Sequence, residues 1–273
     1  MKTVVVAGLV LTLVVASSAD AAVPPPGAPV PRGRVALARA LQTTSADLEE
    51  AIALWRPKSQ PAPDDVVLLA LYQQRIYRLL AGNNGLSRGV LSLLPRKLAQ
   101  TAGDLLTAHR ELHRLTPPIA ARTIKTGRSL PAPMLLSYYR EAQKRFAVPW
   151  NVLAAVNFVE TKFDKLRSSS ASGAQGPMQF MPATWRRYGL GGDVHDAHDA
   201  ILGAANYLRA SGAARNVRTA LHHYNPSRSY VDAVLRYARR IAADRTTFFA
   251  LYSWQVFVKT PRGDRRVTGP GRP

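Results

Sequence analysis

Residues 149–184 read PWNVLAAVNFVETKFDKLRSSSASGAQGPMQFMPAT, and they carry the clearest structural pattern in the chain. Proline fits the first turn of a helix, so the apolar run that follows it predicts a helix over 149–163. A second proline predicts another helix over 182–188, ended by the next glycine. The connecting segment, 167–176, is rich in serine and glycine and is expected to be a loop. One carboxylate, Glu160, lies near the end of the first helix.

The surroundings of Glu160 differ from those of the other acidic residues in this region. It follows a mostly apolar stretch, 152–159, and no basic residue lies one turn before it. A partly desolvated carboxyl has a raised pKa, so it can stay protonated near neutrality and donate a proton. A buried glutamate that accepts hydrogen bonds from the following loop would give the same pattern. The pattern alone therefore leaves a catalytic and a structural interpretation open.

Further motifs match a known family in order and spacing. Besides Glu160-Thr161, the chain has GAQGPMQFMPAT at 173–184, a helix-like segment at 199–208 and ALHHYN at 220–225. Over roughly residues 135–242 it resembles the soluble lytic transglycosylase family, with its catalytic glutamate, Gly-Ala-x-Gly-Leu-Met-Gln-x-Met-Pro-x-Thr and Ala-x-x-x-Tyr-Asn. Several motifs in order make this resemblance more specific than one short motif. It implies a mainly α fold with a lysozyme-like catalytic domain, which we place at 131–243.

The resemblance also implies a reaction and a set of residues. The expected reaction cleaves the β-1,4 bond between N-acetylmuramic acid and N-acetylglucosamine in peptidoglycan and needs neither a cofactor nor a metal. Glu160 would protonate the glycosidic oxygen and then, as a base, help the muramyl 6-hydroxyl close a 1,6-anhydro ring. Most glycosidases use two carboxylates, so the lack of a convincing second one fits this scheme. The implied substrate-binding residues are Ser170, Gln179, Met181, Tyr224 and Asn225.

Each of these residues has an expected role. Tyr224 would donate its hydroxyl to Glu160 or to the sugar, and Asn225 would brace it. Gln179 and Met181 would line the subsite for the acetamido group, and Ser170 would contact a peptide stem or a sugar. Ordinary loop packing is the alternative for all of them, and Met178 and Phe180 are expected to be core residues.

The chain departs from the family pattern in four places. Thr161 stands where serine is usual, which keeps a hydroxyl, and Pro177 replaces leucine, which stiffens the loop. The stretch from Glu160 to Gly176 is one residue longer than is common. Some members place a second, substrate-contacting glutamate before the last helix, whereas this chain has Pro-Ser-Arg-Ser at 226–229. That contact is therefore in doubt.

Other polar clusters are interpreted as structural. Asp164 is expected to cap or order the loop, because two carboxylates on one helix do not flank a sugar ring well. His109 and His113 share a helix face without a visible third metal ligand, so a solvated face is preferred. Helix capping is also preferred to metal binding for a second group, whose spacing matches no calcium or zinc motif: Asp193, His195, Asp196, His198 and Asp199.

The remaining segments are expected to frame the catalytic domain. Residues 1–22 resemble a signal peptide, because a lysine precedes an apolar run too short to span a membrane, and an uncleaved N-terminal anchor is the alternative. Residues 23–34 are a Pro-rich linker, and 35–130 form a helical module with a helix start at Ser45 and helices over 64–80 and 97–115. Residues 244–273 form a basic tail with β-type residues from Phe248 onward and a short hairpin. No other stretch reaches membrane-spanning length, so a secreted or cell-wall location is expected.

Composition limits the alternatives. The 273 residues contain no cysteine, which excludes disulfides and thiol catalysis, and the net charge is +20. Such a charge favours polyanionic partners, here peptidoglycan glycan strands and anionic wall polymers, although Arg-rich composition alone could produce it. A muramidase that uses water on the same fold and a catalytically weak wall-binding protein stay open. A nucleic-acid partner is not expected, because no aromatic and basic motif is present.

Overall fold

A computed structural model describes residues 23–55, 61–120 and 124–271, and the expected signal peptide lies outside these ranges. Within them the fold is mainly α, as predicted, with eleven helices and one small sheet. None of the described helices is long and apolar enough to cross a membrane.

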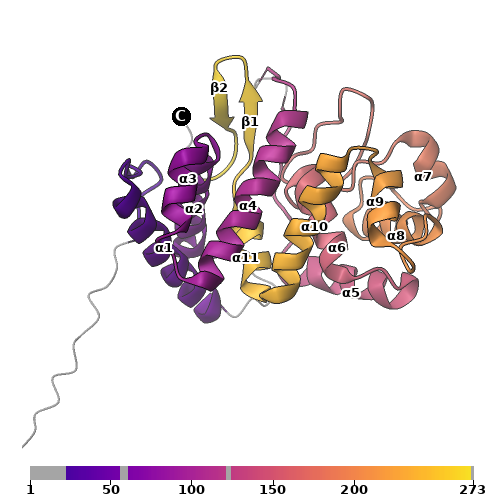
Figure 1. Ribbon diagram of the computed structural model, residues 1–273. Helices are drawn as coiled ribbons and strands as arrows, with labels where there is room; N and C mark the ends of the chain where they lie inside the picture. Colours follow the sequence, from indigo (N-terminus) through magenta and orange to yellow (C-terminus); the bar gives the residue numbers. More distant parts are fainter. Residues whose placement is uncertain (1–22, 56–60, 121–123, 272–273) are drawn as a thin grey trace, which may run out of the picture.

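The helices form three groups that lie side by side (Figure 1). The first group contains α1 (Arg34–Trp55), α2 (Asp64–Ala81) and α3 (Asn84–Leu91). The middle group contains α4 (Arg96–Leu115), α10 (Arg228–Ala243) and α11 (Arg245–Ser253). The third contains α5 (Ala132–Phe146), α6 (Trp150–Thr161), α7 (Pro182–Tyr188), α8 (Ala197–Ala210) and α9 (Val217–Tyr224). One continuous hydrophobic core connects all three groups.

Helix α10 is the central element, because α4 packs on one side of it and α6 on the other. Its apolar residues recur at helical spacing, so one face is buried while the other carries arginines. Ser227 caps its start by accepting a hydrogen bond from the backbone N–H of Tyr230.

The C-terminal tail combines a confirmed and a wrong prediction. The hairpin is present, since β1 (Phe257–Thr260) pairs antiparallel with β2 (Gly263–Arg266) across the expected turn. The β-type residues from Phe248 to Ser253, however, form helix α11. Asp244 caps this helix, and Phe248 is fully buried in the core. Burial of a continuous apolar run has here overridden β-propensity.

Helix boundaries differ from the prediction in other places. The helix start expected at Ser45 is wrong, because α1 continues through this residue, whose hydroxyl accepts a hydrogen bond from Gln73. Helices α3 and α9 were not predicted. An asparagine caps each of them: Asn83 caps the start of α3, and Asn216 caps the start of α9.

Two polar clusters tie segments that are far apart in the sequence. The side-chain amide of Gln74 donates to the carbonyl of Gln255 at 2.8 Å and accepts from its N–H at 2.9 Å. Asp104 on α4 accepts hydrogen bonds from three arginines of α10, Arg236, Arg239 and Arg240. The N-terminal helices are thereby fixed to the last helix of the predicted catalytic domain and to the segment that follows it.

Candidate functional site

Glu160 lies in the last turn of α6, where its half-buried carboxyl faces α10. The hydroxyl of Tyr230, in the first turn of α10, donates a 2.6 Å hydrogen bond to Oε1 of Glu160. Tyr230 is buried, so this bond is shielded from solvent. The two residues are 70 positions apart in the sequence and meet because α6 and α10 pack together.

The protonation of Glu160 is unusual for a carboxyl. Burial raises its pKa to about 7, against the smaller, opposite effects of the Tyr230 hydrogen bond and the charge of Lys162. Desolvation dominates because no arginine or lysine side chain pairs with the carboxylate among the described residues. A carboxyl with this pKa exchanges a proton near neutral pH, as a general acid and base must.

The chain turns back sharply after α6. Lys162, Phe163 and Asp164 all have left-handed backbone conformations, with φ of 55°, 60° and 64°. Such conformations are unfavourable for residues other than glycine, so contacts must hold them. Phe163 is fully buried against Phe158 and Phe248, and the N–H of Asp164 donates to the hydroxyl of Thr161. The helix therefore ends at Thr161, two residues earlier than predicted.

Thr161 also fixes the glycine-rich loop to the helix end. Its hydroxyl donates to the carbonyl of Pro177 at 2.7 Å, and the side-chain amide of Asn157 donates to the same carbonyl at 2.9 Å. Asn157 in turn accepts a 2.6 Å hydrogen bond from the hydroxyl of Tyr139. The hydroxyl that threonine retains in place of serine is thus fully used in positioning the loop beside Glu160.

Gly176 in this loop cannot carry a side chain. Its φ is +73°, and a Cβ built on it would lie 1.8 Å from the carbonyl oxygen of Val194. The loop therefore packs directly on the segment before α8, which places Met178 and Phe180 in the core, as expected for both.

Tyr224 does not bond to Glu160, so that part of the prediction is wrong. Its hydroxyl donates instead to the carbonyl of Met178 at 2.6 Å. The ring packs against Phe180 and Tyr207, with centroids 5.9 and 5.6 Å apart. Tyr224 remains close enough to Glu160 for its own pKa to be raised, by burial first and then by the Glu160 charge. A contact from Tyr224 to a sugar stays a prediction.

The other expected substrate-binding residues mostly order the loops. Asn225 accepts a hydrogen bond from the N–H of Ser227, so it braces the start of α10 instead of the Tyr224 hydroxyl. Ser170 accepts one from the N–H of Ala174. Gln179, with φ of 51°, donates to the carbonyl of Gly176. Met181 is exposed, so its side chain is free to contact a ligand.

Asp164, the second carboxylate near the site, pairs with an arginine. Asp164 forms an ion pair with Arg167 at 3.1 Å, in keeping with the expected loop-ordering role. Burial raises the pKa of Asp164, and the charge and hydrogen bond of Arg167 act in the opposite direction.

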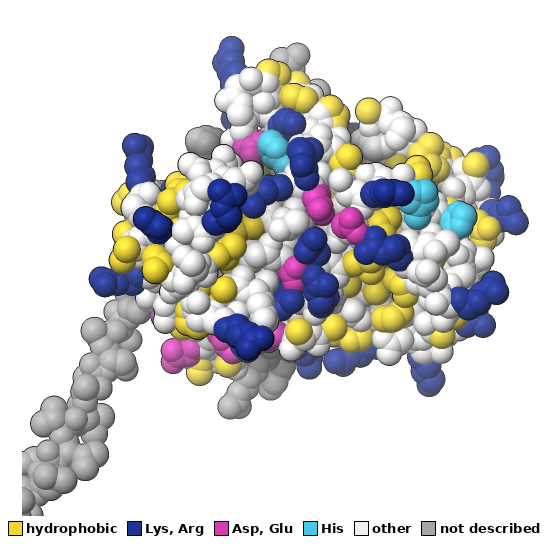
Figure 2. Space-filling view, in the orientation of Figure 1, with side chains coloured by type: hydrophobic (Ala, Val, Ile, Leu, Met, Phe, Trp, Pro, Cys, Tyr) yellow, Lys and Arg dark blue, Asp and Glu magenta, His cyan; other side chains and the backbone are white. Residues whose placement is uncertain are grey.

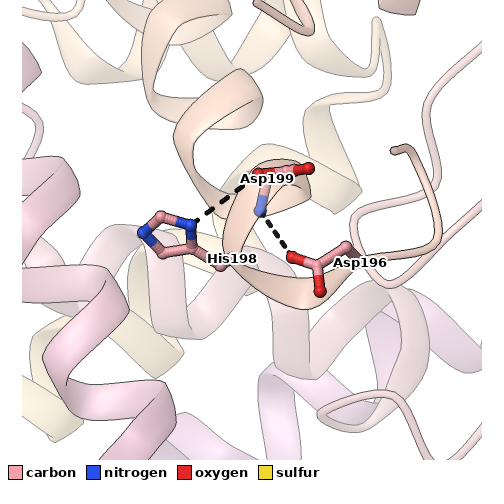
Figure 3. Close-up of side chains that lie close together, drawn as sticks. All are labelled: Asp196, His198 and Asp199. Atoms are coloured by element: carbon pink, nitrogen blue, oxygen red, sulfur yellow. Dashed lines mark hydrogen bonds and ion pairs between the residues drawn. The ribbon is translucent and has the colours of Figure 1, made fainter. Parts of the chain in front are cut away.

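The acidic and histidine cluster before α8 forms hydrogen bonds typical of a helix start. Asp196, His198 and Asp199 lie close together in Figure 3, within reach of a shared cation. Asp196 accepts from the N–H of Asp199 as the helix cap, and Asp199 accepts from the N–H of Asp193. His198 contacts Glu141 of α5 at 2.9 Å. These bonds explain the positions of the carboxylates, as the capping interpretation expects.

Tyr230 is the site residue that sequence reasoning missed. It lies on the apolar face of α10 together with Val234 and Tyr237, which is the place of an ordinary core residue. The sequence offered one weak signal, a tyrosine at the first buried position of the last helix before the tail.

Comparisons with known proteins agree with the predicted family. Residues 137–245 match the model of a family described as the transglycosylase SLT domain, which confirms the predicted resemblance for this part of the chain. A protein of Thiobacillus denitrificans, "Membrane-bound lytic murein transglycosylase F", is 31% identical over 121 residues. That alignment covers 41% of this chain and 24% of the relative, so the chain matches about a quarter of the relative's length. No solved structure gives a significant match.

Proposed function

We propose that this chain, which carries a transglycosylase SLT domain over residues 137–245, is a peptidoglycan lytic transglycosylase. The observation that carries the proposal is the carboxyl of Glu160, with its pKa raised to about 7 by burial, at the position that the family resemblance assigns to the catalytic acid. The similarity to a lytic murein transglycosylase supports the same substrate class.

The proposed mechanism uses Glu160 twice. As an acid, it donates its proton to the glycosidic oxygen, and the bond from that oxygen to C1 of N-acetylmuramic acid breaks. The acetamido group of the same sugar stabilises the positive charge. As a base, Glu160 takes the proton of the muramyl 6-hydroxyl while that oxygen bonds to C1. The product is a 1,6-anhydro sugar, water is not consumed, and Glu160 ends protonated as it began.

The surroundings of Glu160 suit this double use. Tyr230 donates a neutral hydrogen bond, which supports the carboxylate form between the two steps without fixing it as strongly as an arginine would. Asp164 is held by Arg167 and offers no free second carboxylate. The exposed Met181 and the ring of Tyr224 are proposed to contact the sugars, while Ser170, Gln179 and Asn225 shape the loops that hold them.

The proposed location follows from the proposed reaction, and the further partners follow from the net charge. Action on peptidoglycan requires a place outside the cytoplasmic membrane, consistent with the signal peptide expected at residues 1–22. The net charge of +20 is proposed to favour contact with anionic wall polymers.

Mass spectrometry of products from purified peptidoglycan tests the proposal. The parent protein should release muropeptides one water lighter than hydrolytic products, and Glu160→Gln should release none. Products with an ordinary reducing end would replace the proposal by a muramidase. Absence of products from the folded parent would favour a wall-binding protein, and equal products from both proteins would show that Glu160 is not the catalyst.

A further inference from the structure

Two adjoining cavities lie where α2 and α4 meet the β1–β2 hairpin, outside the site around Glu160. The outer one has a volume of about 350 Å³ and the inner one about 120 Å³. Arg78, His109, His113 and Asp264 line both cavities, so the two form one recess. Its inner end reaches Lys162, just beyond the end of α6.

Positive charge dominates the recess. Figure 2 shows many dark blue side chains and a few magenta ones over α4 and below the hairpin. Asp264 is the one acidic residue among the described lining residues, and it already accepts from both Arg78 and His113. The lysines and arginines that line the recess are Arg78, Arg110, Arg114, Lys162 and Lys259.

Most of these cations are hydrogen-bonded but keep their positive charge. Arg110 donates to the carbonyls of Leu80 and Ala81 at the end of α2, and Lys259 donates to two carbonyls at the end of α4. Carbonyl groups satisfy the hydrogen bonds of a cation but leave its charge in place. Arg114 is exposed at the rim and has no ion-pair partner among the described residues.

Three further polar groups line the inner cavity without a hydrogen-bond partner among the described residues. These are the hydroxyls of Tyr77 and Tyr237 and the imidazole of His109. Both tyrosines are almost fully buried, at 4% and 2% exposed. Their polar atoms are not among the described side-chain atoms that are both buried and unpartnered, so they face the open space of the cavity, where a ligand can take their hydrogen bonds.

The unpartnered groups can all donate a hydrogen bond at neutral pH. Burial raises the pKa of both tyrosines, which keeps their hydroxyls protonated. Burial, followed by the charge of Arg78, lowers the pKa of His109 to about 3, so the ring is neutral and carries one N–H. Free hydrogen-bond donors beside cations that carbonyl groups do not neutralise are the lining that an anion requires.

We propose that this recess binds a small molecule bearing an oxyanion, a phosphate or a carboxylate group. The outer cavity lies within the range of ligand sites in size, while the inner cavity can hold only a small group. In this arrangement Arg114 and Arg110 hold the anion at the mouth, and the inner donors hold oxygen atoms of the same ligand. The inference does not depend on the proposed enzymatic activity, because it concerns a different recess.

Isothermal titration calorimetry of the full chain at low ionic strength tests this site. The probes are inorganic pyrophosphate and citrate, which separate a preference for phosphate from one for carboxylate. We expect saturable binding of at least one probe by the parent. Arg114→Ala should weaken it about tenfold, because one charge-assisted contact is lost. Asp264→Asn should strengthen it, because Arg78 and His113 lose their competing carboxylate partner.

The matched control is Arg140→Ala, which removes an exposed arginine of α5 outside the recess. It should bind the probes like the parent. If the parent shows no saturable binding, or if Arg114→Ala and Arg140→Ala weaken it equally, the site is refuted and the protein attracts anions only through its overall charge. The comparison of the two arginine variants suffices even if Asp264→Asn disturbs the hairpin.

Discussion

Helix α10 bonds to two carboxylates, one buried and one half-buried, and the donors that it offers them differ. Asp104 of α4 is 8% exposed and receives hydrogen bonds from three arginines near the C-terminal end of α10. Glu160 of α6 receives one hydrogen bond, from the phenol of Tyr230 at the N-terminal end of the same helix. One helix thus provides full charge compensation at one end and a single neutral donor at the other.

The pKa values follow from this difference. Burial raises the pKa of both carboxyls, but at Asp104 the hydrogen bonds and charges of Arg239 and Arg240 outweigh burial and lower it. At Glu160 the burial effect prevails, and the pKa rises to about 7. A carboxylate with matched arginines is held in one charge state and serves structure, whereas one without them can change its charge state and serve chemistry.

The largest effect is expected for Asp104→Ala. The substitution leaves three arginines without their shared acceptor, so the free energy of unfolding should fall by about 3 kcal/mol. Because its pKa is lowered by folding, the parent residue stabilises the protein above its unfolded value of 3.8 and loses this effect as pH falls through the folded value. Urea unfolding at pH 7 measures the loss in Asp104→Ala, and urea unfolding of the parent at decreasing pH measures the pH dependence.

Asp232→Asn provides the control for Asp104→Ala. Asp232 pairs with Arg218 on α9, but both side chains are well exposed, so the loss should stay below about 0.5 kcal/mol. Equal losses for the two variants would contradict the view that burial gives the Asp104 cluster its importance.

An effect of opposite sign is expected for Glu160→Gln. Folding raises the pKa of Glu160 from 4.5 to about 7, so the folded state loses stability as pH rises through this interval. Replacing the carboxyl by an amide removes that penalty. After allowance for partial exposure, Glu160→Gln should be more stable than the parent by on the order of 1 kcal/mol at pH 8, with no gain near pH 4. Thermal unfolding at both pH values measures this, and a variant that is less stable at pH 8 would contradict it.

The smallest effect is expected for Tyr230→Phe, and it sharpens the comparison at Glu160. The lost hydroxyl lowers the pKa of Glu160 in the parent, so the variant should have a higher one. Since the proposed acid must be protonated, the descending limb of kcat/KM against pH should move to higher pH, with a loss of about threefold at pH 6 from the missing hydrogen bond.

Tyr252→Phe is the matched control for Tyr230→Phe. Its hydroxyl donates to the carbonyl of Leu130, away from Glu160. This variant should lose some stability but keep the parent pH profile. A profile that moves in both variants, or in neither, would show that Tyr230 does not set the protonation of Glu160.

Local pattern was sufficient to predict several elements and the central carboxylate. Proline at helix starts and glycine after helix ends predicted the region of α6 and all of α7, and the apolar stretch before Glu160 marked it as unusual. These signals act within one or two turns of the chain. The end of α6 was misplaced because three residues there adopt a left-handed backbone that only their tertiary contacts stabilise.

The remaining features depend on contacts between distant segments. Tyr230 could not be identified as the partner of Glu160, because pairing across 70 residues is set by how α6 and α10 pack. Helix α11 was missed because its residues have high β-propensity, although Asp244 caps its start. The same limit applies to Asp104, whose three arginines lie more than 130 residues later.

The paired amides of Gln74 and Gln255, 181 residues apart, have a consequence for the order of folding. During synthesis, α2 leaves the ribosome long before its partner segment exists. Contacts of such high sequence separation form slowly, because a long loop must close first. The first helices therefore have part of their apolar surface uncovered until the chain has been made as far as Gln255.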